Sequence, residues 1–105
     1  MDSVLGMIGL AKRAGKVVTG AEICEVAVKK GKSKLIIIAE DISENGRKAI
    51  TDTCKYYNVK YIEYGNKSQL GRFTGAEERA VISVNDRGFS QTILKKYAES
   101  LIRKE

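Results

Sequence analysis

Histidine is absent from this chain, and cysteine occurs only twice in its 105 residues. Without histidine, a Ser-His-Asp or Cys-His triad cannot form, and metal sites that need an imidazole ligand are excluded. Cys24 and Cys54 make no CxxC pair, which is typical of an intracellular chain rather than a small disulfide-rich one. We expect two buried free thiols, with a disulfide or redox pair as the alternative. The composition favours a non-catalytic protein with no metal and no cofactor.

Long hydrophobic runs and proline are also missing. No apolar run approaches the roughly 20 residues of a membrane span. Residues 1–10 are apolar but lack the basic flank of a signal peptide. No low-complexity linker or internal repeat divides the chain, and 43% of its residues are hydrophobic. We expect a single domain over residues 1–105, in a cytoplasmic protein without membrane association.

Charge is plentiful and unevenly distributed. The net charge is +6, from 19 Lys and Arg against 13 Asp and Glu. Residues 1–34 and 66–105 are basic, whereas residues 35–65 are slightly acidic. A basic surplus attracts polyanions, of which RNA is the most abundant in cytoplasm. The alternative is a solvated surface that keeps the protein soluble.

Hydrophobic periodicity and capping residues predict alternating helices and strands. On the third helix we expect a buried side formed by Ala49, Ile50, Thr53, Cys54 and Tyr57. Because the run Leu35 to Ala39 is apolar throughout, it predicts a central strand covered on both faces. Short connections between alternating elements imply an α/β fold with a mostly parallel four-stranded sheet between two helical layers. The helices are expected to begin at Asp2 or Ser3, Ala21, Ser43, Asn66 and Asp86 or Ser90, and the strands to cover 16–19, 35–39, 59–62 and 80–84.

Two short motifs invite enzymatic interpretations. Gly31-Lys32-Ser33 is similar to the end of a P-loop, but Val26 stands where its first glycine belongs, and a helix precedes it instead of a strand. Glu40-Asp41 follows the central strand, where ligands bind in open α/β sheets. These acids could bind magnesium or act as acid and base, but adjacent strand residues point to opposite faces. We favour helix capping by Asp41 or Ser43, or acceptance of hydrogen bonds from base edges by Glu40.

Two glycine-containing segments are candidate binding sites. Gly20 precedes a helix whose first turn offers free N–H groups to a phosphate or a base edge, and Lys16 lies just before it. Lysines 29, 30, 32 and 34 gather at the other end of that helix, where a plain solvated face is the alternative. The second segment, residues 71–75, contains two glycines. They allow either close packing and the end of a helix, or the close approach of an RNA loop to the backbone. In the second case Arg72 and Arg79 are the nearby cations.

A family resemblance rests on three of these segments. Residues 20–31, the strand and acids of residues 34–41, and Leu70-Gly71-Arg72 followed by Gly75 together resemble the ribosomal protein superfamily of the L7Ae and L30e type. Residues 11–16 and Asn45 make the chain most similar to the small bacterial branch called YlxQ-like. The resemblance covers nearly the whole chain and implies a three-layer αβα sandwich that binds RNA without catalysis.

Members of this family grip kink-turns, which are bent RNA elements built on tandem sheared G·A pairs. The resemblance implies that the helix after Gly20, the acid at Glu40, the lysine at Lys67 and the loop after Gly75 make this contact. At the positions where kink-turn binders carry Asn-Glu and a later lysine, this chain has Glu22, Ile23 and Val26.

The sequence thus predicts a ribosomal-protein-like domain that binds structured RNA, with ribosomal RNA or the ribosome as candidate partners and no DNA. Backbone N–H groups seat the RNA, lysines and arginines contact phosphates, and glutamates accept from base amino groups. A protein-interaction adaptor on the same fold is the alternative. The predicted RNA-binding residues are Lys16, Gly20, Ala21, Glu22, Lys32, Glu40, Lys67, Arg72 and Arg79.

Overall fold

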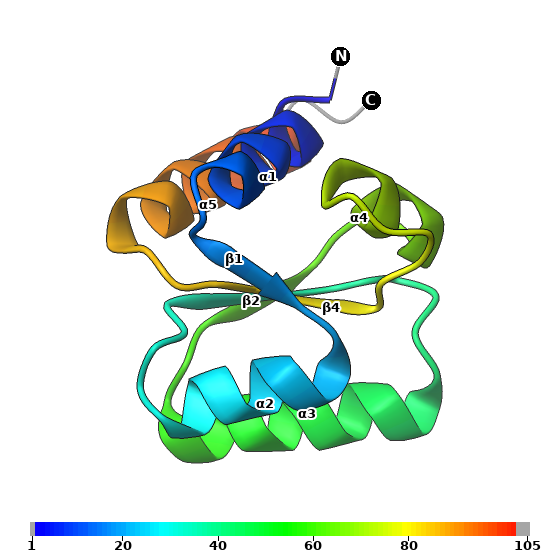
Figure 1. The fold of residues 1–105 in the computed structure, drawn as a ribbon, viewed down its shortest axis with the longest axis vertical. Coiled ribbons are helices and arrows are strands. Elements are labelled where there is room, and N and C mark those ends of the chain that lie inside the picture. Colours follow the sequence, from blue (N-terminus) through cyan, green and yellow to red (C-terminus); the bar gives the residue numbers. More distant parts are fainter. Residues whose placement is uncertain (1, 103–105) are drawn as a thin grey trace.

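The alternation expected from the sequence is present in the computed structural model, which describes residues 2–102 (Figure 1). The helices within these residues are α1 (Ser3–Arg13), α2 (Ala21–Lys29), α3 (Glu44–Tyr57), α4 (Lys67–Phe73) and α5 (Arg87–Ile102). The strands are β1 (Val17–Thr19), β2 (Leu35–Ile38), β3 (Tyr61–Glu63) and β4 (Val81–Val84).

The sheet has the strand order β1-β4-β2-β3. The prediction of a mostly parallel sheet is wrong, because one strand, β4, runs in the opposite direction to the other three. Only β2 and β3 pair in parallel, whereas β4 runs antiparallel to both β1 and β2. The reason lies in α4, which does not cross the sheet. The Arg79 N–H donates to the Lys67 carbonyl (3.0 Å). The chain after α4 therefore returns to the place where α4 begins. β4 therefore starts at the edge where β3 ends, and the sheet is mostly antiparallel.

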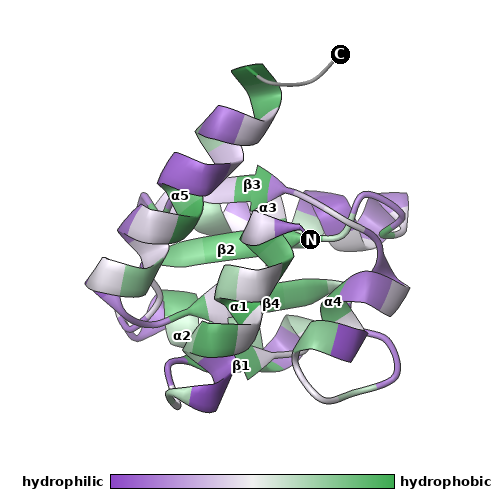
Figure 2. Cartoon of the chain, turned by 90° about the horizontal axis from the view of Figure 1, so that it is seen from above, coloured by the Kyte–Doolittle hydropathy of each residue, from purple (hydrophilic) through white to green (hydrophobic). Residues whose placement is uncertain are grey.

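Helices cover both faces of the sheet, as predicted. Helices α1, α4 and α5 lie on one face, and α2 and α3 lie on the other (Figure 1). The two inner strands, β2 and β4, are buried along their whole length and form a hydrophobic layer between the helices (Figure 2). Since α2 and α3 both connect parallel strands and step in the same direction across the sheet, they lie on the same face.

Side-chain caps fix where four of the helices begin. Asp2 accepts from the Leu5 N–H at the start of α1, and Ser43 accepts from the Gly46 N–H at the start of α3. Asn66 and Gln69 form the predicted capping box of α4. The Asp86 carboxylate accepts from the Phe89 N–H in α5. Short polar side chains at these positions satisfy N–H groups that the helix cannot.

Both cysteines are buried free thiols, as expected. Cys24 and Cys54 lie in the core between α2, α3 and the sheet. Burial away from water raises the pKa of Cys24 to about 12 and that of Cys54 to about 11. The predictions for Ala49 and Tyr57 are wrong: Ala49 is exposed and Tyr57 is 42% exposed, because the buried face of α3 is narrower than its sequence pattern indicates. It centres on Ile50 and Cys54.

Candidate nucleic-acid interface

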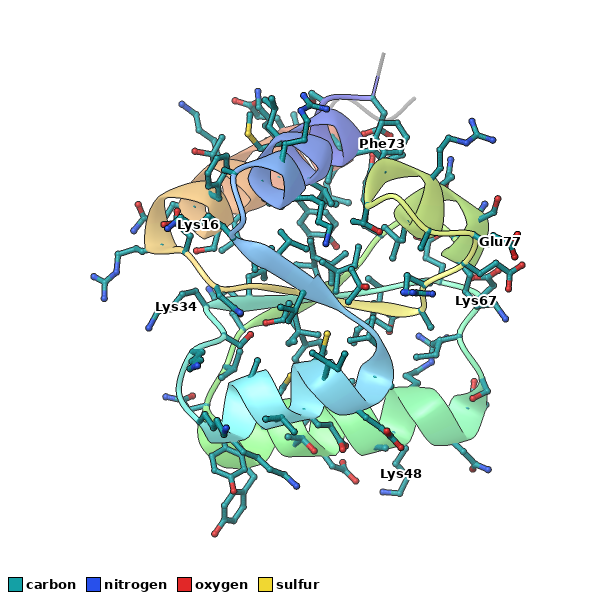
Figure 3. All side chains as sticks on the ribbon, viewed as in Figure 1. Lys16, Lys34, Lys48, Lys67, Phe73 and Glu77 are labelled. Atoms are coloured by element: carbon teal, nitrogen blue, oxygen red, sulfur yellow. The ribbon has the colours of Figure 1, made fainter. Side chains whose placement is uncertain are left out.

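The two edges of the sheet differ in the elements that meet there. Strands β1, β2 and β3 end at one edge, where β4 begins; we call this the α2 edge and define it by Gly20, Glu40, Gly65 and Ala80. The Glu40 N–H donates to the Gly65 carbonyl (2.7 Å) there, and the Ala39 N–H donates to the Ala80 carbonyl (2.8 Å). The opposite edge, which we call the lysine edge, is defined by Lys16, Lys34, Lys60 and Asn85. Figure 3 shows Lys16 and Lys34 on one side of the molecule and Lys67 and Glu77 on the other.

Helix α2 begins without a side-chain cap at the α2 edge. Its N-cap is Gly20, with φ of 103°, a conformation that favours glycine. The Gly20 N–H donates to the Val81 carbonyl (3.0 Å), which fixes the start of α2 against β4. A β-carbon built on Gly20 would meet nothing within 4 Å, so the space outside this turn is open. The first-turn N–H groups of α2 therefore face a site that an acceptor can enter.

One of the predicted cations, Arg79, lies beside this turn, and a second, Lys67, lies at the same edge. The Arg79 Nε donates to the Thr19 hydroxyl (3.0 Å), and its Nη1 donates to the Glu78 carbonyl (2.7 Å). Since Thr19 immediately precedes Gly20, these bonds hold the guanidinium next to the start of α2. Lys67 opens α4 at the same edge, joined to Arg79 through its backbone carbonyl.

The neighbouring acids play separate roles. Asp41 accepts from the Lys67 N–H (2.9 Å), so it ties the β2–α3 loop to α4, while Ser43 caps α3. Arg47 forms an ion pair with Glu63 and donates to the Glu40 carbonyl (3.2 Å). The hydrogen bond to Glu63 raises the pKa of Arg47. The exposed Glu40 carboxylate has no ion-pair partner among residues 2–102, so it can accept from a ligand.

Gly71 and Arg72 belong to a different environment. A β-carbon on Gly71 would lie 2.5 Å from the Glu77 carbonyl oxygen, so this glycine allows the following loop to pack on α4. Close packing is thus the observed role. Arg72 faces α1, where it lines a groove with Leu10 and Phe73. It does not join Gly20 at the α2 edge.

Lys16 and Lys32 are also separated from Gly20, although Lys16 precedes it by only four residues in the sequence. The Lys16 carbonyl accepts from the Asn85 N–H (2.8 Å) at the lysine edge, a full strand away from Gly20. Lys32 precedes β2 at that same edge. Within segments 20–22, 40–47, 63–67 and 77–79 of the α2 edge, acids outnumber cations by seven to three. The acids are Glu22, Glu40, Asp41, Glu44, Glu63, Glu77 and Glu78, and the cations are Arg47, Lys67 and Arg79.

The outer face of α2 continues this site with apolar side chains. Glu22 is exposed in the first turn, and Ile23 and Val26 are 57% and 48% exposed. These are the positions at which the resemblance implies base-reading side chains. The α2 edge therefore combines open N–H groups, two cations, free carboxylates and apolar contacts.

Residues 2–102 contain neither a metal site nor a membrane-spanning helix. No group of three or more potential ligands is placed to hold a metal ion in this part of the chain. None of its helices is long and apolar enough to span a membrane.

Comparison with known proteins identifies the family. A sequence model described as the ribosomal protein L7Ae/L30e/S12e/Gadd45 family matches residues 2–94. The chain belongs to this family. The predicted resemblance is thereby confirmed, and the sandwich of α2 and α3 against α1, α4 and α5 is the fold of an L7Ae-type protein.

Relatives of this family member include bacterial and archaeal proteins. A Bacillus subtilis protein described as RNA-binding protein YlxQ is 39% identical over 88 residues, covering 84% of this chain and 88% of the relative. Large ribosomal subunit protein eL8 of Picrophilus torridus is 33% identical over 87 residues, covering 82% and 68%. A solved structure from Bacillus halodurans, described as a protein with unknown function, superposes with a TM-score of 0.90 at 35% identity, covering 93% and 99%.

Proposed function

We propose that this protein is a non-catalytic RNA-binding protein that docks a folded RNA at the α2 edge. The observation that carries the proposal is the uncapped start of α2, with Arg79 held next to it and Lys67 at the same edge. Membership of the L7Ae family and the description of the Bacillus subtilis relative as an RNA-binding protein support it. The first-turn N–H groups of α2 at Ala21 and Glu22 bind a phosphate or a base acceptor, and the two cations contact phosphates. The Gly20 N–H is not among these donors, because it already donates to the Val81 carbonyl.

The charge of this edge favours base contacts over phosphate contacts. Because acids outnumber cations there, a continuous phosphate backbone gains little from it. Glu22 and Glu40 instead accept from base amino groups, as carboxylates do from cytosine N4. Ile23 and Val26 offer apolar contact to bases that leave the helical stack. The target is therefore a bent RNA with unpaired bases, of the kink-turn kind, read by a different set of side chains.

The test compares two fluorescein-labelled RNAs by anisotropy at several salt concentrations. One is a duplex with a bulge next to tandem G·A pairs, and the other is the fully paired duplex. We expect preference for the bulged RNA. Lys67→Glu should weaken its binding and lower the log–log salt slope by about 0.7 to 0.9. Glu40→Gln should reduce the preference between the two RNAs by roughly 1–3 kcal/mol.

Lys95→Glu is the matched control, since Lys95 is an exposed lysine on α5, away from the α2 edge. Melting temperatures of all variants should stay close to that of the parent protein, because exposed charges contribute little to stability. Equal affinity for the two RNAs, or a Lys67→Glu variant that behaves like Lys95→Glu, would contradict the proposal.

The exposure of Ile23 and Val26 also favours a second candidate, a protein-interaction adaptor that uses the apolar face of α2. Affinity capture before and after ribonuclease treatment separates the two functions. Partners that depart after digestion support RNA docking. Partners that survive digestion but depart on Ile23→Glu substitution support the adaptor.

A further inference from the structure

The lysine edge carries a groove that the proposed α2-edge site does not use. The groove lies where α2 and α3 end and where β2 and β3 begin, and its volume is about 450 Å³. Lys29, Lys34, Lys60 and Tyr57 line it. No acidic side chain lines it, and none of the three lysines forms an ion pair within residues 2–102.

The surroundings of the groove are strongly cationic. Segments 12–16, 29–34, 55–60 and 85–87, which meet at this edge, contain ten lysines and arginines and one acid. That acid, Asp86, is engaged as the cap of α5. Two helix C-termini face the groove, and each contributes a charge of only about −0.5. Together these helix ends supply about one negative charge, which Lys55 in the last turn of α3 offsets, so Lys29, Lys34 and Lys60 remain as a positive surplus.

Tyr57 gives the groove an aromatic wall. It is the last residue of α3, and its ring is 4.9 Å from that of Tyr56, centroid to centroid, in an edge-on arrangement. Asn58 follows in the left-handed conformation (φ 60°), which turns the chain sharply. Tyr57 and Lys60 can therefore line one groove although they lie on either side of a helix end.

An aromatic ring beside several free lysines matches the chemistry of an unpaired nucleotide. A base has a flat face that stacks on a tyrosine ring, and the flanking phosphates pair with lysines. An A-form duplex offers phosphates but no free base face, so Tyr57 would contribute nothing to its binding. The aromatic wall thus favours single-stranded over double-stranded RNA.

We propose that this groove binds single-stranded RNA, with a base stacked on Tyr57 and phosphates held by Lys29, Lys34 and Lys60. The inference rests on the proposed RNA-binding function, because it adds a second RNA contact to the same protein. The groove and the α2 edge lie at opposite ends of the strands. A folded RNA docked at the α2 edge therefore reaches the groove only through an unpaired extension or through a second RNA segment.

The experiment measures the fluorescence anisotropy of a fluorescein-labelled oligoadenylate at several salt concentrations. This RNA forms no base pairs at neutral pH and is therefore single-stranded. Tyr57→Ala should weaken binding about tenfold, and Tyr57→Phe should restore it, since phenylalanine keeps the stacking face. Tyr56→Ala is the matched control: Tyr56 is 81% exposed and does not line the groove. Its affinity should stay within about twofold of the parent. The double variant Lys34→Glu, Lys60→Glu should lower the log–log salt slope by about 1.4, and Lys95→Glu should not.

Three outcomes overturn the inference: parental binding by Tyr57→Ala, an equal loss in Tyr56→Ala, or an unchanged salt slope in the double lysine variant. Loss of binding in the lysine variant with none in Tyr57→Ala also overturns it, since the groove would then take polyanions without stacking. The bulged RNA is titrated in parallel with the same variants and with Lys67→Glu. If Lys67→Glu weakens the bulged RNA while groove variants leave oligoadenylate binding unchanged, only the groove inference fails.

Discussion

Two glycines show how differently one residue type can serve this fold. Gly20 adopts a positive φ and faces open space, whereas Gly71 is packed against the backbone of Glu77. The sequence predicts an open helix start after Gly20, but for Gly71 it leaves open whether close packing or access for RNA requires the glycine. That distinction depends on where the loop after α4 returns, which no local pattern encodes. Tyr57 is a similar case, since its helical position alone predicts burial.

The packing at Gly71 gives a direct stability prediction. Gly71→Ala should lower the free energy of unfolding by about 1–3 kcal/mol, because the new methyl group overlaps the Glu77 backbone. Gly6→Ala on α1 is the control with the opposite sign. Nothing lies within 4 Å of a β-carbon there, so alanine should add about 0.5–1 kcal/mol through helix propensity. Urea unfolding measures both changes, and a Gly71→Ala protein as stable as the parent would show that the loop yields without cost.

At the level of elements, helix starts were predictable and strand direction was not. Asp2, Ser43 and Asn66 cap helices at positions where a short polar residue precedes a helical hydrophobic pattern. The local sequence is therefore sufficient to predict where these helices begin. The direction of β4 depends instead on the hydrogen bond from Arg79 to Lys67, twelve residues earlier, which brings the chain back to the edge it came from. The central position of β2 was predictable because its residues are apolar on both faces.

The burial of β2 predicts a large cavity effect. Ile37 is 0% exposed and belongs to the core beneath α1 and α5. Ile37→Ala should cost roughly 2–5 kcal/mol of unfolding free energy, and Ile37→Val only about 0.5–1.5 kcal/mol. Ile23→Ala, at an exposed position on α2, should change stability little. Chemical denaturation of the three variants checks this order, and an unaltered transition for Ile37→Ala would mean that its neighbours close the space.

For the molecule as a whole, the number of charges was predictable but their grouping was not. Lys16 and Gly20 are neighbours in sequence, yet β1 carries them to opposite edges of the sheet. The sequence therefore identifies the cations, but the fold decides which of them share a surface. Arg79, although distant from Gly20 in sequence, is held next to the start of α2, and Lys67 lies at the same edge.

The buried thiols predict how overall stability depends on pH. In the unfolded chain the cysteines ionise near pH 8.5, whereas folding raises the pKa of Cys24 to about 12 and that of Cys54 to about 11. Above pH 8.5 the unfolded state therefore holds fewer protons, and stability falls as the pH rises. Urea unfolding between pH 8 and pH 10 should show this decline, and it should be smaller in a Cys24→Ala, Cys54→Ala variant. An equal decline in both proteins would assign it to other groups.

The separation of charge between the two ends of the strands gives the molecule a large electric dipole moment. In the field of a polyanion this dipole turns the protein so that its lysine edge arrives first. Under the proposed docking at the α2 edge, the first encounter with RNA would be driven by charge and indifferent to sequence, and recognition would follow as a separate step at the far side of the sheet.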